Sequence, residues 1–258
     1  MTTLIPILVI VGVFVLGALL AGGAMWLRER LGSQKRVLAY RDTYEPLFAD
    51  LWSNEMHRRL AALFVAQRTA NTRGGAVGLA SVLISFIRRR MSAEPEQGES
   101  YEDVRLALSI LSARAVRQAQ SESGQALDLS GIDFRGAPLS GVDLSGFRLA
   151  QCRFDHCRLA GAKLVGADLS GASLEAADLH GADLRRADFS ESDLTDADFT
   201  ASRVGSANFT NANIGGAILA EAGGLSQEQL DQAYGDGGTA VPERMRFVPG
   251  RSQRPRRE

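Results

Sequence analysis

The chain has 258 residues, of which 45% are apolar and 23% charged, and its formal net charge is −1. This length can hold two domains, and a charge so close to zero indicates no particular partner for the chain as a whole. The presence of only two cysteines argues against a framework of disulfides.

The N-terminal region is apolar from Leu4 to Leu27, a run of 24 residues without a charged side chain. As a helix this run would be about 36 Å long, which is enough to cross the hydrocarbon core of a membrane with some tilt. A cleaved signal peptide and a buried core helix are the alternatives, but no basic segment precedes the run and no clear cleavage site follows it. We therefore predict a transmembrane anchor in residues 1–27.

Basic residues predict the orientation of this anchor, because they follow the apolar run and none precedes it. They are Arg28, Arg30, Lys35, Arg36 and Arg41. The expected location is the inner (cytoplasmic) membrane, with a single span, the N-terminus outside and the C-terminal body in the cytoplasm.

Residues 28–122 have no short repeat and are expected to form a juxtamembrane α-helical segment. Residues 38–68 place apolar side chains among charged ones, as amphipathic helices do. Ala76 to Ile87 is strongly apolar but too short to span a membrane, so we expect a buried helix, with a membrane-surface helix as the alternative. After a linker at Ser92 to Gly98, a further helix is expected to open with a capping residue within Ser100 to Asp103. Its apolar face would hold Val104, Leu108, Leu111 and Ala115.

A period of five residues governs the chain from 123 to 224. Every fifth position is large and apolar, nineteen times in a row, and the residue two positions earlier is mostly small. Residues two apart on an extended chain point to the same side, so both sets can share one interior while the other three positions face water. This period fits neither a helix nor a strand, and it predicts a solenoid. The large positions are Leu129, Phe134, Leu139, Leu144, Leu149, Phe154, Leu159, Leu164, Leu169, Leu174, Leu179, Leu184, Phe189, Leu194, Phe199, Val204, Phe209, Ile214 and Leu219.

Glycine recurs at one of the outward positions, where the chain must turn a corner, because glycine accepts left-handed backbone angles without steric cost. Units such as Ala167-Asp168-Leu169-Ser170-Gly171 and Ala182-Asp183-Leu184 resemble the pentapeptide repeat family over residues 125–224. The segment before the repeats is similar, more loosely, to that of membrane-anchored bacterial members. The resemblance implies a right-handed quadrilateral β-helix with four pentapeptides per coil, about five coils and a length of about 24 Å.

The predicted fold class is therefore a mainly β solenoid, preceded by a transmembrane helix and a small α-helical segment. A capping helix is expected at residues 225–236, because Ser226 and Gln229 form a capping box and Leu225 can pack against Leu230. The remaining residues, 237–258, read as a basic tail without a fixed structure.

Stacking every twentieth residue aligns the outward side chains in columns about 4.8 Å apart, where opposite charges attract each other. One column alternates fully in the order Asp143, Lys163, Asp183, Arg203. The candidate interaction surface is a belt of basic residues around one coil: Arg148, Arg153, Arg158 and Lys163. The alternative is that these charges form ladders that only support the register of the coils.

The sequence shows no arrangement of residues typical of catalysis. His57, His156 and His180 have no serine, aspartate or metal-ligand pattern around them, and there is no phosphate-binding loop. Cys152 and Cys157 flank one histidine, but the five-residue frame turns both thiols inward and the imidazole outward. We therefore expect no catalytic residue, no cofactor and no metal site.

The predicted function is that of a non-catalytic, membrane-tethered cytoplasmic scaffold whose rigid surface binds an unknown protein partner. The alternative is a DNA mimic that inhibits or modulates a type II topoisomerase, because residues 125–224 hold 14 acidic and 8 basic residues, a net charge of −6. A rod of about 24 Å would match only about seven base pairs, and the arginine coil interrupts its acidic surface. Nucleic acid is not expected as a ligand, and no oligomeric state is predicted.

Overall fold

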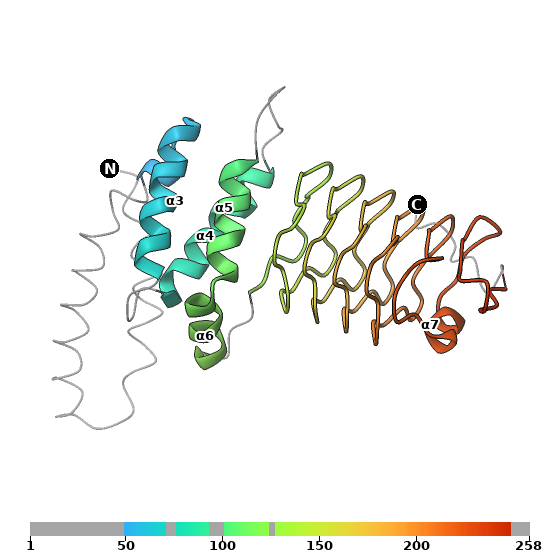
Figure 1. Ribbon diagram of the computed structural model, residues 1–258. Coiled ribbons are helices and arrows are strands. Elements are labelled where there is room, and N and C mark those ends of the chain that lie inside the picture. The colour runs from blue at the N-terminus through green and yellow to red at the C-terminus, as the bar shows by residue number, and fades with distance from the viewer. Residues whose placement is uncertain (1–48, 71–75, 93–100, 124–126, 249–258) are drawn as a thin grey trace, which may run out of the picture. The chain divides into compact units, whose positions relative to one another are not determined.

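The computed structural model describes residues 49–70, 76–92, 101–123 and 127–248 (Figure 1). Five helices have both ends within these ranges, four before the repeats and one after them. The helices are α3 (Met56–Ala70), α4 (Ala76–Ser92), α5 (Glu102–Ser112), α6 (Arg114–Ser123) and α7 (Gln227–Gln232).

The first four of these helices pack on one another, with α5 in contact with α3, α4 and α6. The predicted apolar face of α5 is confirmed at Val104, Leu108 and Leu111, which are all buried. The predicted buried helix is also confirmed, because α4 buries Leu83 and Phe86 among others. The capping prediction is wrong within the described residues: the N-cap of α5 is Tyr101, whose side chain makes no capping hydrogen bond.

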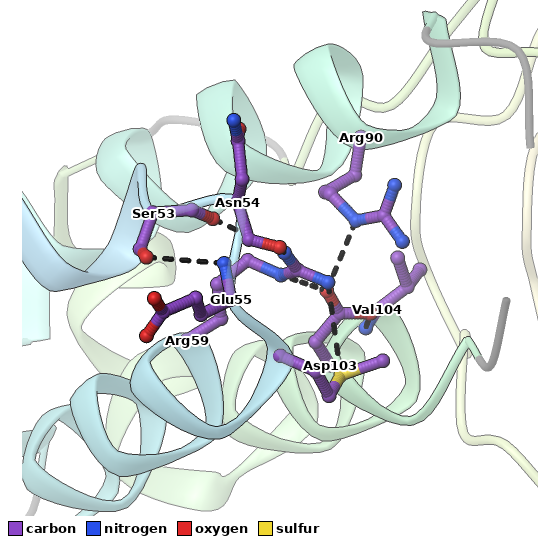
Figure 2. Close-up of polar contacts among 8 residues, drawn as sticks. Ser53, Asn54, Glu55, Arg59, Arg90, Asp103 and Val104 are labelled. Atoms are coloured by element: carbon purple, nitrogen blue, oxygen red, sulfur yellow. Dashed lines mark hydrogen bonds and ion pairs between the residues drawn. The ribbon is translucent and has the colours of Figure 1, made fainter. Parts of the chain in front are cut away.

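A buried ion triad joins three of these helices (Figure 2). The Oδ2 atom of Asp103, in α5, accepts hydrogen bonds from Arg59 Nε at 2.6 Å and from Arg90 Nε at 3.0 Å. Arg59 belongs to α3 and Arg90 to α4, and Asp103 is fully buried. Arg59 Nη1 also donates to the carbonyls of Ser53 and Asn54, at 3.1 and 2.7 Å. These contacts compensate charges that would be costly to bury alone.

The repeats from residue 127 onward wind into stacked coils (Figure 1). Parallel bridges pair residues twenty positions apart, as in Asp128 with Arg148, so four five-residue sides complete one coil. The backbone closes each layer onto the next: Leu129 N donates to Arg148 O at 2.8 Å, and Arg148 N donates to Leu127 O at 3.0 Å. All nineteen predicted large positions are buried.

The corners of the coils have left-handed backbone angles, as the glycine pattern predicted. Gly131 has a φ of 72° and Gly171 a φ of 64°. Nine other corner residues adopt the same region without being glycine, among them Ala176 at 53° and Ala201 at 55°. The fold therefore imposes this angle at each corner from Gly131 to Gly216, even where the side chain disfavours it.

The predicted fold class requires correction. Among the described residues there is no strand, only isolated parallel bridges, and the regular secondary structure is helical. The physical reason is the short side of each coil: one bridged residue lies between two turns, so no ladder of consecutive pairs can form. The predicted mainly β class, which the family resemblance implied, was therefore wrong for the described residues.

The membrane prediction is corrected as well. No helix in the described part of the chain is long and apolar enough to cross a membrane. The apolar run from Leu4 to Leu27, on which the inner-membrane location and orientation depended, lies outside the described residues.

The first coil has no coil before it, so its carbonyls on that side lack the amide donors that later coils receive. In the second coil, for example, Ala150 O accepts a hydrogen bond from Gly131 N at 2.9 Å. The equivalent carbonyl in the first coil belongs to Ser130, and it accepts one from Arg88 Nη1 of α4 at 2.9 Å. Arg88 Nη2 also donates to Asp128 O at 3.2 Å.

Arginines of two other helices donate to first-coil carbonyls in the same way. Arg105 Nη2 of α5 donates to Ser140 O at 3.3 Å, and Arg117 Nη1 of α6 donates to Ser145 O at 3.1 Å. Both carbonyls lie at corners of the first coil. Guanidinium groups therefore replace the backbone donors of an absent coil, which satisfies carbonyls that would otherwise lack partners. We call Arg88, Arg105 and Arg117 the arginine cap.

The other end of the solenoid is closed by α7 and the chain that follows it. The predicted capping box is confirmed: Ser226 N donates to Gln229 Oε1 at 2.8 Å, and Gln229 N donates to Ser226 Oγ at 3.3 Å. Gln229 Nε2 then donates to Ala207 O at 2.7 Å. Farther on, Ala240 is bridged to Ile218, so the folded chain continues beyond α7.

Candidate interaction surface

The four predicted belt residues lie on four different sides of the second coil, and all are exposed. Each occupies the bridged position of its side, between the residues twenty positions before and after it. The four triplets are Asp128, Arg148, Asp168; Asp133, Arg153, Ser173; Pro138, Arg158, Asp178; and Asp143, Lys163, Asp183. The columns expected from the repeat are therefore neighbours in the structure.

The acids of the first coil are engaged by arginines that lie outside the belt. Asp143 Oδ1 lies 2.7 Å from Arg117 Nη2, a residue of the arginine cap. Asp133 Oδ2 lies 2.7 Å from Arg135 Nη2, within its own corner. The third acid, Asp128, pairs more loosely with Arg88, at 3.8 Å.

The pKa values of two of these carboxyls follow from the same contacts. The side-chain hydrogen bond from Arg135 is the largest influence on Asp133, and its pKa lies below the ordinary value of 3.8. Burial raises the pKa of Asp143, but hydrogen bonds from Ser145 and Arg117 outweigh it, and the net shift is downward. Both groups are therefore carboxylates at neutral pH, and each already has a partner.

The belt residues themselves form few ion pairs. Arg153 lies 3.7 Å from Asp133 and 3.4 Å from Asp155. Arg148, Arg158 and Lys163 form no ion pair with any residue in the described ranges.

The column of Lys163 shows this most clearly. Its neighbours are Asp143, which pairs with Arg117 at 2.7 Å, and Asp183, which pairs with Arg185 at 2.7 Å. Of the alternating charges in this column, only Arg203 and Asp183 come within 3.7 Å of each other. A ladder that supports the register therefore accounts for some of these charges and leaves Lys163 unexplained.

The cysteine and histidine pattern has a structural explanation. Cys152 and Cys157 are buried free thiols whose Sγ atoms donate to Leu129 O and Ala137 O, at 3.1 and 3.0 Å. Burial raises the pKa of Cys152 to about 11 and that of Cys157 to about 12, so both stay protonated and weakly nucleophilic. His156 points to solvent at a corner. Within the described residues, no group of three potential ligands could hold a metal ion.

Sequence reasoning missed the arginine cap and the buried triad. The run Arg88-Arg89-Arg90 was the available signal, but a basic run at the end of a helix usually indicates a solvated face. Their partners are remote in sequence: Ser130 lies 42 residues from Arg88, and Asp103 lies 44 residues from Arg59.

Comparison with known proteins agrees with the geometry of the coils. The family model for pentapeptide repeats matches residues 137–175 and 152–190. No significant match is found among curated proteins.

Several solved structures are similar to part of the chain. A pentapeptide repeat protein from the thylakoid lumen of Arabidopsis thaliana is 36% identical over 42% of this chain and 77% of its own, with a TM-score of 0.40. HetL, a pentapeptide repeat protein involved in heterocyst differentiation regulation in the cyanobacterium Nostoc, is 36% identical over 40% of this chain and 45% of its own, with a TM-score of 0.36. QnrB1, a plasmid-mediated fluoroquinolone resistance protein, is 26% identical over 43% of this chain and 58% of its own, with a TM-score of 0.19.

The family model and the first two structures are those of pentapeptide repeat proteins, and none of them shows the membrane-anchored type that the sequence suggested. The family model matches a stretch that winds into twenty-residue coils, and the thylakoid-lumen protein is 36% identical over 77% of its own length. On this evidence the chain belongs to the pentapeptide repeat family.

Proposed function

We propose that the solenoid is a non-catalytic scaffold that holds a fixed surface for binding a protein partner. Proteins of this family are generally structural or interaction proteins. Two observations together carry the proposal. Backbone hydrogen bonds run without a break from coil to coil. Arg148, Arg158 and Lys163 are exposed cations that form no ion pair with any described residue. A surface built in this way changes shape little, so a partner that binds it loses little binding energy to ordering.

The exposed belt supports a binding role over a purely structural one. Arginine is enriched at protein interfaces, and unpaired surface charges set partner choice and association rate more than they set folding stability. Three of the four belt cations add little to the solenoid itself, because they lack ion pairs among the described residues.

Site-specific photo-cross-linking in the native cells tests this function. A photo-reactive residue would replace each belt residue in turn and, as a control, Leu164, which is buried inside the same coil. The scaffold proposal expects one adduct of constant mass from at least two neighbouring belt positions and none from the interior position. Equal adducts from all positions, or none from any, would contradict it.

A DNA mimic that acts on a type II topoisomerase is the second candidate, favoured by the net charge of −6 over residues 125–224. Acidic columns do run through the later coils, as in Asp168 with Asp188 and Asp178 with Asp198. A supercoiling assay with the full chain tests this candidate. Inhibition at micromolar protein that is lost on neutralising Asp188 and Asp198 would favour it, and an unaffected topoisomerase would exclude it.

A further inference from the structure

We infer that one edge of the second coil binds an extended acidic segment of a partner protein. The inference rests on the scaffold function proposed above and names the chemistry of the partner. Its residues are Arg158 and Lys163, on adjacent sides of the second coil, together with Arg105 of α5. We call these three residues the basic edge.

The three side chains are neighbours through the backbone of the first two coils. Arg158 and Lys163 flank the corner formed by Ala160 and Gly161, which is small and uncharged. The corner directly before it in the stack is that of Ser140, because Gly141 N donates to Ala160 O at 2.9 Å. Arg105 Nη2 donates to Ser140 O at 3.3 Å, which brings its guanidinium over this same corner.

The acids around the basic edge are largely neutralised by other arginines. Asp143 pairs with Arg117 and Asp183 pairs with Arg185, both at 2.7 Å, so neither is left to compensate Lys163. On the neighbouring side, Arg158 is bridged to Pro138 and to Asp178.

Asp178 is therefore the only carboxylate bridged to the basic edge that lacks an arginine partner among the described residues. Its Oδ1 atom accepts a hydrogen bond from His180 N at 3.0 Å. Three exposed cations thus face one carboxylate, and the local charge is positive although the solenoid as a whole is negative.

The narrowness of the basic edge favours an extended peptide as the partner. Neighbouring coils lie about 4.8 Å apart, which is the spacing of adjacent strands, so an extended peptide can follow one coil without covering the next. A DNA duplex, whose major groove alone is about 12 Å wide, would extend over more than two coils. It would therefore also cover Asp178 and Asp198, which follow Arg158 on the same side of the solenoid. An anionic membrane surface would meet the same acids. A short run of glutamate or aspartate fits the basic edge best, because carboxylates form planar, bidentate hydrogen bonds with arginine.

The test uses the full chain and a fluorescein-labelled peptide of eight residues that alternates glutamate with serine, which places all carboxylates on one side of an extended strand. Binding is measured by fluorescence anisotropy at low salt for the wild type and for Arg158→Glu/Lys163→Glu. The matched control is Arg186→Glu/Arg203→Glu, which makes the same change of charge at exposed positions on later coils. Circular dichroism melting confirms that both variants are folded.

We expect the basic-edge variant to bind the peptide at least tenfold more weakly than the wild type, and the control to stay within twofold. An equal loss of peptide affinity in both variants would overturn the inference, because it would show that the peptide responds to the total charge of the protein and not to the basic edge. The absence of saturable peptide binding would also overturn it.

Two further probes separate the acidic peptide from other anions: a twelve-base-pair DNA duplex and vesicles that contain phosphatidylglycerol. Tighter binding of either probe than of the peptide, lost in the basic-edge variant, would replace the inference with a polyanion site. If the inference fails while photo-cross-linking still yields one adduct on another side of the coil, the scaffold function stands and only the site is wrong.

Discussion

At the scale of single residues, Asp103 holds the helical segment together. It is a fully buried carboxylate that accepts hydrogen bonds from arginines of two other helices (Figure 2). Removing it takes away the carboxylate to which Nε of Arg59 donates, and Arg59 is only 4% exposed. Losing one partner of a buried ion pair costs about 3–5 kcal/mol, more than most substitutions do.

We therefore expect Asp103→Ala to lower the free energy of unfolding of the helical segment by about 3–5 kcal/mol, measured by urea denaturation. Glu243→Ala removes an exposed carboxylate and serves as the control, with an expected effect of about 0.5 kcal/mol or less. A loss for Asp103→Ala that is no larger than the control would show that the triad adds nothing to stability.

The corner residues allow a stabilising change. Ala201 is exposed and has a φ of 55°, where an L-residue with a Cβ is strained by about 1–2 kcal/mol. Glycine relieves this strain, although its greater freedom in the unfolded chain returns about half of the gain. Ala201→Gly should raise the free energy of unfolding by about 0.5–1 kcal/mol, whereas Ala187→Gly, at a buried position inside the coil, should lower it. A loss of stability in both variants would contradict the imposed corner angle.

Acidification should destabilise the solenoid through Asp133 and Asp183. The pKa of each carboxyl lies below its ordinary value of 3.8. The largest cause of this lowering is a side-chain hydrogen bond from the arginine two positions later, Arg135 for Asp133 and Arg185 for Asp183. A carboxyl whose pKa is depressed by folding stabilises the protein above its unfolded pKa, and this stabilisation is lost as the pH falls through its folded pKa. The free energy of unfolding should therefore be constant near neutral pH and fall below about pH 4.

The double variant Asp133→Asn/Asp183→Asn isolates this effect. It should flatten the acid limb of a plot of unfolding free energy against pH, since the two groups no longer titrate. An acid limb as steep as that of the wild type would assign the pH dependence to other groups.

At the scale of elements, the arginine cap ends the solenoid where the repeats begin. Side chains from α4, α5 and α6 donate to carbonyls of the first coil that receive no backbone amide. Without such donors, the first coil would present an open edge, and open edges tend to fray or to pair with other chains.

We expect Arg88→Ala/Arg117→Ala to speed hydrogen exchange at Gly131 and Gly146, whose amides link the first coil to the second. Gly181, which links the third coil to the fourth, should keep the exchange rate of the wild type because fraying is local. Arg186→Ala serves as the control for loss of an exposed arginine. Uniform acceleration along the solenoid, or no change at Gly131, would contradict the capping role.

Local sequence signals were sufficient for some elements. The five-residue period identified all nineteen interior positions, and the capping box at Ser226 and Gln229 was readable because both residues lie in one turn. The class of the solenoid was misjudged, since residue pattern alone did not reveal that turns at every corner leave one bridged residue per side. The arginine cap was missed because a flexible side chain gives no periodic signal for a partner 42 residues away.

The basic belt was visible in sequence, but its state of pairing was not. Sequence showed acids both before and after the belt residue in two columns, those of Arg148 and Lys163, which favoured ladders of compensated charge. The structure shows instead that Arg117 and Arg185 take the acids on both sides of Lys163. A carboxylate in these columns can pair with either of two cations. The pair that forms depends on the side-chain geometry at the corner and on arginines of helices that are distant in sequence.

At the scale of the whole molecule, the proposals depend on a solenoid that keeps its register. Each coil donates to and accepts from its neighbours, and aromatic rings stack inside it, as with Phe134 and Phe154 at 5.1 Å between centroids. A close-packed interior of this kind resists deformation. The outward charges are then held at fixed spacings, which is what a scaffold requires.

The central claim is that the solenoid is rigid and has twenty residues per coil. Pulsed electron–electron double resonance, which measures the distance between two spin labels, tests it most directly. Pro138 and Ile218 lie on the same side of the solenoid and are connected by four successive bridges, so Pro138→Cys and Ile218→Cys provide attachment sites four coils apart. Cys152→Ala and Cys157→Ala remove the native thiols. We predict a single narrow distance distribution centred near 19 Å, four times the spacing of about 4.8 Å. A broad distribution, or one centred beyond about 30 Å, would contradict a rigid solenoid with twenty residues per coil.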